Sequence, residues 1–121
     1  MKQEKIFVAY KLLERLNKVP GLPFGICSKL YMLKKNLAPY YEAQQEKQMV
    51  LFEAVGIDEN GQVEITKELK KSLADILKTE VDCEVQPVKI ELTQDMADKL
   101  GLTGEIIEQL EGFVEFVEVG A

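Results

Sequence analysis

The sequence predicts a helix-dominated α+β fold, in which an N-terminal antiparallel helical hairpin packs with a small antiparallel β element and short C-terminal helices. Over the first half of the chain, apolar residues recur every three or four positions, as they do on one face of a helix. From Val81 the apolar period changes to two, which is typical of a strand. Threonines and glycines then bracket two short stretches near the C-terminus, as caps bracket helices.

The length of the chain fits one domain. A chain of 121 residues is long enough to bury a working hydrophobic core. We find no internal repeat and no long linker, so we expect a single domain over residues 1–121. Within it, residues 1–55 would form the helical hairpin and residues 56–121 the α+β portion.

Two amphipathic helices are predicted in the hairpin. The first covers residues 2–18, and the second begins near Phe24, because the prolines and glycine of residues 19–23 stop the first. Pro39 removes a helical hydrogen bond, so we expect a kink in one long helix. The expected core stripes consist of Ile6, Ala9, Tyr10, Leu13 and Leu16 in the first helix, and Ile26, Leu30, Leu33, Leu37, Tyr40, Val50, Leu51 and Ala54 in the second.

The second half contains turn, strand and cap signals. Gly56 is placed to end the long helix, residues 58–61 form a turn, and residues 62–65 read as a short strand. Thr66 can cap a third helix with Leu69, Leu73, Ile76 and Leu77 on one face.

A bulged strand and a final segment complete the prediction. Alternation over residues 81–92 changes phase by one at Gln86 and Pro87, so a bulge there would keep one face buried. Thr93 caps a short helix that ends at Gly101, and Thr103 caps another that stops at Gly112. Residues 113–119 form a last strand or a docked extended arm.

The composition argues against most catalytic chemistry. The chain has no histidine, which removes the commonest general base and the commonest zinc ligand. The glycines do not fall in a phosphate-binding spacing, and Ser28 and Ser72 have no histidine to activate them. We therefore expect no enzyme, no metal and no cofactor. A small enzyme that uses only carboxylates and lysines stays open as an alternative.

The charge is unevenly distributed along the chain. The net charge is −6, with +5 over residues 1–49 and −11 over residues 50–121. The second helix places aromatic residues among basic groups, as a nucleic-acid surface might, at Tyr31, Lys34, Lys35, Tyr40 and Tyr41. The acidic total nevertheless makes nucleic acid an unfavoured partner. The acidic half suggests a further alternative, an inhibitor of a host DNA-binding protein. Cys27 and Cys83 occupy apolar positions, where we expect free thiols.

The order of short motifs resembles a family of small uncharacterised proteins encoded by phages and prophages of Gram-positive bacteria. The resemblance is carried by Leu22-Pro23 before a long helix with Ser28, Leu30, Leu33 and Lys34, by Pro39 with Glu42-Ala43, by the turn over residues 56–62, by Glu84-Val85 with Pro87-Val88-Lys89, and by Leu110 to Val114. Where that family's closing motif has a proline after Leu-Glu, this chain has Gly112. The resemblance implies a phage product that acts in the host cytoplasm or in the virion.

We therefore predict a non-enzymatic interaction or virion-assembly protein that binds a protein partner or a second copy of itself. No apolar run approaches the roughly eighteen residues of a membrane span, so no membrane partner is expected. The candidate contact residues lie on the second helix, off its core stripe, and are Tyr31, Tyr41, Met49 and Phe52.

Overall fold

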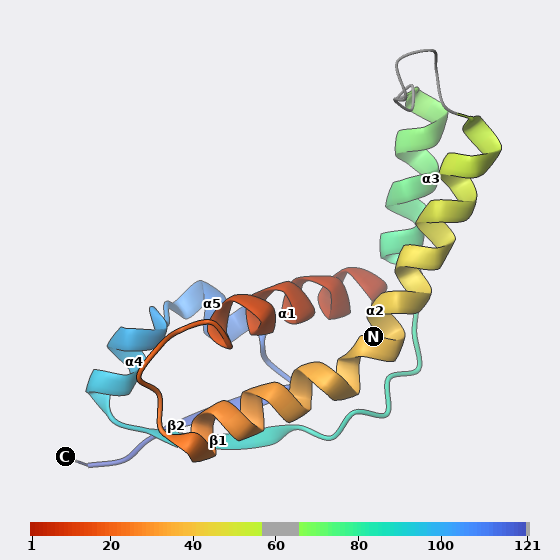
Figure 1. The fold of residues 1–121 in the computed structure, drawn as a ribbon. Helices are drawn as coiled ribbons and strands as arrows, with labels where there is room; N and C mark the ends of the chain where they lie inside the picture. The colour runs from red at the N-terminus through yellow and green to blue at the C-terminus, as the bar shows by residue number, and fades with distance from the viewer. Residues whose placement is uncertain (57–65, 121) are drawn as a thin grey trace.

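The structure is a computed structural model that describes residues 1–56 and 66–120. Its elements are α1 (Gln3–Leu16), α2 (Phe24–Val55), α3 (Lys67–Lys78), β1 (Val88–Leu92), α4 (Gln94–Leu100), α5 (Gly104–Gln109) and β2 (Val114–Glu118). Most of these elements gather in one body, from which the distal part of α2 and α3 project together (Figure 1). The helix-dominated α+β class is therefore as predicted.

The core of the body lies between α1, the first part of α2 and the small sheet. Buried residues recur every three or four positions on both helices, which gives each helix one continuous apolar face. Phe113, which directly precedes β2, is the largest fully buried side chain. The core cluster consists of Ile6, Ala9, Leu13, Leu16, Ile26, Leu30, Leu33, Leu37, Ile90, Leu92, Leu100, Ile106, Leu110, Phe113 and Val114.

The N-terminal hairpin is more limited than the sequence suggested. α1 is 14 residues long and α2 is 32, so α1 can cover less than half of α2. α2 bends near Pro39, and its distal part beyond the bend runs beside α3 (Figure 1). We call residues 40–55 of α2 together with α3 the arm.

The β element is parallel, so the prediction of antiparallel strands is wrong. β1 and β2 pair in parallel, with Val88 opposite Val114 and Leu92 opposite Glu118. The cause is the connection between them, because α4 and α5 carry the chain back to the end of the sheet at which β1 starts. The predicted last strand is β2, and its backbone bonds extend to Val119, whose N–H donates to the Leu92 carbonyl.

The bulged strand is only partly a strand. Residues 88–92 form β1, whereas residues 81–87 run alongside the body without joining the sheet. The side-chain pattern nevertheless follows the predicted change of phase. Val81, Cys83 and Val85 are half-buried, Gln86 and Pro87 are both exposed, and alternation then resumes with Ile90 and Leu92 buried.

Most predicted helix caps are confirmed. The hydroxyls of Thr66, Thr93 and Thr103 accept hydrogen bonds from the backbone N–H groups of Leu69, Met96 and Ile106. Gly56 and Gly101 end their helices with positive φ angles of 87° and 66°, which glycine adopts without strain. The helix after Thr103 ends at Gln109, before the predicted stop at Gly112. The predicted turn over 58–61 and strand over 62–65 lie outside the described residues.

Two phenylalanines in opposite environments test this core. Phe113 is 1% exposed and Phe24 is 86% exposed. In dilute solution, Phe113→Ala should lower the free energy of unfolding by about 3–5 kcal/mol. The control Phe24→Ala should change it by less than about 0.5 kcal/mol. Urea unfolding followed by circular dichroism measures both, and equal effects would contradict the described core.

Candidate functional site

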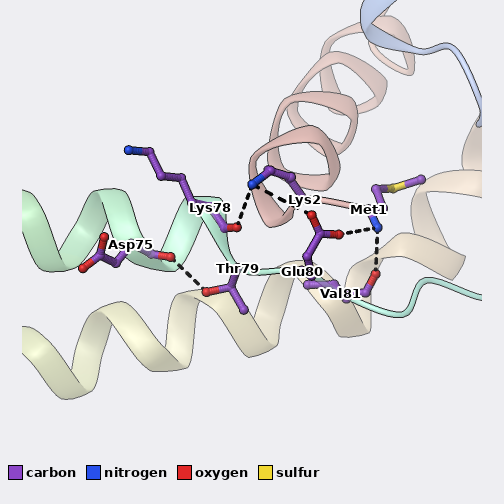
Figure 2. Close-up of polar contacts among 7 residues, drawn as sticks. All are labelled: Met1, Lys2, Asp75, Lys78, Thr79, Glu80 and Val81. Atoms are coloured by element: carbon purple, nitrogen blue, oxygen red, sulfur yellow. Dashed lines mark hydrogen bonds and ion pairs between the residues drawn. The ribbon is translucent and has the colours of Figure 1, made fainter.

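The base of the arm is fixed to the N-terminus of α1 (Figure 2). The Met1 ammonium donates to Glu80 Oε2 at 2.9 Å and to the Val81 carbonyl at 3.3 Å, and the Val81 N–H donates to the Met1 carbonyl at 2.7 Å. Lys2 and Glu80 also form an antiparallel β-bridge. These contacts hold the chain that leaves α3 against the body.

A buried pair of glutamines anchors the α2 side of the arm. Gln3 and Gln44 are 4% and 1% exposed, and Gln3 Nε2 donates to Gln44 Oε1 at 3.3 Å and to the Tyr40 carbonyl at 3.2 Å. The amide nitrogen of Gln44 has no partner among the described residues. Because an unpaired buried donor costs free energy, this pair fixes the position of α2 beyond the bend more than it adds stability.

The two helices of the arm cover each other incompletely. α3 is strongly amphipathic, yet only Leu69 on it is buried, while Leu73, Ile76 and Leu77 are half-buried. On α2, Leu51 and Phe52 are half-buried, and Met49 and Val50 remain 59% and 64% exposed. A helix with an apolar face normally packs that face against a neighbour. The arm therefore keeps apolar surface that its own fold does not cover.

Part of this surface is a groove between α2 and α3. The groove has a volume of about 620 Å³, and we call it the arm groove. Its lining is mainly apolar and includes the charged residues Glu46 and Lys47 on α2 and Asp75 on α3. The complete lining consists of Ala43, Glu46, Lys47, Val50, Leu51, Ser72, Asp75 and Ile76.

The two helices of the arm have opposite charge. Residues 40–55 contain three carboxylates and one lysine, a net charge of −2, whereas α3 contains four lysines and two carboxylates, a net charge of +2. Lys47 of α2 and Asp75 of α3 both line the arm groove, and no ion pair within the described residues joins them. The groove thus offers charges of both signs to whatever covers it.

The structure does not bring the four predicted contact residues together. Tyr31 is 58% exposed on the body part of α2. The ring of Tyr41 stacks on Tyr10 of α1 at 4.0 Å between centroids, so it contributes to the packing of the two helices. Met49 and Phe52 do lie on the arm, although neither lines the arm groove.

The core stripe predicted for α2 does not hold along the arm. The core stripe of α2 was extended through Val50, yet Val50 is exposed at the groove. α2 keeps contact with α1 just beyond Pro39, through Tyr41 and Gln44, but Val50 lies further along the arm. A core stripe continued to Val50 therefore no longer marks a buried face. The apolar face of α3 is the signal that could have indicated the groove. Two helices that pack only on each other bury just their contact faces, so the remaining apolar residues stay exposed.

Of the tyrosines and lysines singled out on α2, Tyr41 and Lys34 contact α1. Lys11 Nζ lies 5.2 Å from the Tyr41 ring centre, and Lys34 Nζ lies 5.5 Å from that of Tyr10. Hydrogen bonding to Tyr41 raises the pKa of Lys11, and burial, reinforced by the charge of Glu14, raises the pKa of Tyr10. These groups stabilise the contact between α1 and α2.

The acidic half places several carboxylates around α5. A hollow of about 650 Å³ beside α1 and α5 is lined by Glu4, Glu105, Glu108 and Glu111, together with Lys2 and Lys5. Its charges are therefore of mixed sign. In the described part of the chain, no three or more cysteines and carboxylates gather as a metal site would require. Cys27 and Cys83 are free thiols.

Comparison with known proteins identifies no relative. No protein-family model matches the chain, and no curated protein or solved structure shows significant similarity to it. No helix in the described ranges combines the length and the apolar character that crossing a membrane requires.

The contact between Met1 and Glu80 predicts a pH dependence of stability. The hydrogen bond and charge of the Met1 ammonium lower the pKa of Glu80. The ionised carboxylate therefore stabilises the folded state above the unfolded pKa of about 4.3, and this contribution is lost as the pH falls through the lowered folded pKa. Glu80→Gln should slightly lower the Tm near neutral pH and leave it unchanged in acid.

Thermal unfolding followed by circular dichroism across this pH range measures the effect. Glu115→Gln, at an exposed position of β2, is the control. A Tm difference for Glu80→Gln that persists unchanged below the folded pKa would contradict the assigned contact.

Proposed function

We propose that this protein is a non-enzymatic assembly protein that pairs with a second copy of itself through the arm. The single observation that carries the proposal is the arm groove, an apolar surface between two helices that project from the body. The setting that the family resemblance implies is a phage or prophage protein that takes part in virion assembly.

The chemistry of the arm favours a helical partner. Two helices that already lie side by side need one or two more to enclose an apolar core, as in a four-helix bundle. A second arm supplies two helices of matching length. α3 has 12 residues, which corresponds to about 18 Å of helix at a rise of 1.5 Å per residue.

The charges favour a second copy over an unrelated helix. In a two-fold symmetric dimer, each surface meets its own copy, so it must be self-complementary. The α2 part of the arm is net negative and α3 is net positive, so packing α3 of one copy on α2 of the other joins opposite charges. Lys47 of each copy would then lie near Asp75 of the other.

The pairing is expected to be weak. The arm is short, and exposed ion pairs contribute only about 0.2–1 kcal/mol each. Contacts at the low end of the interface size range are commonly transient, so we expect a Kd on the order of micromolar. Such reversible contacts suit proteins that assemble into larger structures.

A charged residue placed in the arm groove tests the proposal. Val50→Asp should weaken association at least tenfold, which is about 1.4 kcal/mol, because dimer formation would bury an unpaired carboxylate. Sedimentation equilibrium at several concentrations measures this as a lower weight-average mass.

Met32→Asp is the matched control, because Met32 is exposed on the same helix but lies in the body. It should leave the mass distribution unchanged, and circular dichroism should give both variants the wild-type helix content. A wild-type chain that stays monomeric at millimolar concentration, or a mass distribution insensitive to Val50→Asp, would refute pairing through the arm.

A further inference from the structure

Phe24 is an apolar side chain that the fold leaves in water. It is the first residue of α2, and at 86% it has the highest exposed fraction among the large apolar side chains that the structure describes. Burying such a side chain is worth about 1.5–3 kcal/mol.

An apolar hollow lies directly beside Phe24, and we call it the end pocket. Its volume is about 300 Å³, and the two neighbours of Phe24 in the chain, Pro23 and Gly25, both line it. Phe24 itself does not contribute to the lining. The remaining lining comes from α2 itself, β1, the start of α4 and the residue after β2, and consists of Ile26, Lys29, Ile90, Glu91, Leu92, Thr93, Met96 and Val119.

The end pocket and Phe24 can complement each other between two molecules. Phe24 is exposed to solvent and does not line the pocket, so the pocket is open to the ring of another copy. A two-fold axis that passes between Phe24 and the end pocket would place the ring of each copy in the pocket of the other. A projection next to a matching depression is the requirement for such a self-complementary contact.

The charges at the end pocket fit the same arrangement. Lys29 and Glu91 both line it and have opposite signs. The Lys29 ammonium is already held in place, because it donates to the Lys89 carbonyl at 2.8 Å. A patch with one charge sign would repel its own copy, whereas this patch can pair Lys29 of one copy with Glu91 of the other.

We infer that the end of the body formed by Phe24 and the end pocket is a second interface between copies of this chain. This surface lies at the start of α2, and the arm lies at its other end (Figure 1). Two different two-fold contacts at opposite ends of one chain link copies into an open linear assembly. The contact at Phe24 stands independently, and only the growth beyond a dimer rests on the proposed function of the arm.

Sedimentation equilibrium on four proteins separates the two contacts. The wild type should form species heavier than a dimer as its concentration rises. Phe24→Asp should stop at a dimer joined through the arm, and Val50→Asp should stop at a dimer joined through Phe24. The double variant should be monomeric, and each single variant should lose at least tenfold in affinity at its own contact.

The control is Ile107→Asp, because Ile107 is exposed on α5 and lies outside the end pocket. Unfolding by urea shows that the variants stay folded, as expected for substitutions at exposed positions. A mass distribution that Phe24→Asp leaves unchanged would overturn the inference. A monomeric Phe24→Asp variant together with an unaffected Val50→Asp variant would support it and refute only pairing through the arm.

Discussion

The bend of α2 at Pro39 is the constraint on which the rest of the architecture depends. Proline has no N–H to donate and its ring clashes with the preceding turn, so a helix that continues through it must bend. The first part of α2 stays in the core, with Leu30, Leu33 and Leu37 fully buried. The second part leaves α1, which gives α3 a partner and creates the arm.

The bend alone does not set the direction of the arm. Residues at the start of the chain hold both segments at the base of the arm. Gln3 donates to the Tyr40 carbonyl of α2. Met1 contacts Glu80 and Val81, which follow α3 (Figure 2). The first residues of the chain therefore connect the body to the arm on both sides. Because the arm is positioned this way, its uncovered apolar groove is a fixed surface, which suits docking.

The sequence predicted well what depends on short stretches of chain. The caps at Thr66, Thr93 and Thr103 were predictable because a capping hydrogen bond joins residues only three positions apart. The bend was predictable because the proline ring of Pro39 itself disrupts the helix. The shift in the alternation of buried and exposed residues at Gln86 and Pro87 was also predictable, because this alternation involves only neighbouring residues.

The sequence-based predictions were wrong for features that depend on contacts between segments far apart in the chain. The strands are parallel because α4 and α5 bring the chain back to the end of the sheet at which β1 starts. The apolar pattern of a strand does not specify the path of such a connection. Val50 was assigned to the core because its spacing continues the stripe of α2, but the bend had already taken that face away from α1. Phe24 was expected to begin the second helix, as it does, but nothing in the sequence pattern predicted that its ring would be 86% exposed.

The central claim is that two copies meet through the arm with Lys47 of each facing Asp75 of the other. A mixing experiment with Lys47→Glu and Asp75→Lys, each in the Phe24→Asp background, tests it most directly. Each variant alone brings like charges together in both pairs and should stay monomeric, whereas their mixture restores two opposite pairs. Sedimentation equilibrium should then detect a one-to-one dimer only in the mixture. A mixture no heavier than its separate components would contradict this account of the arm.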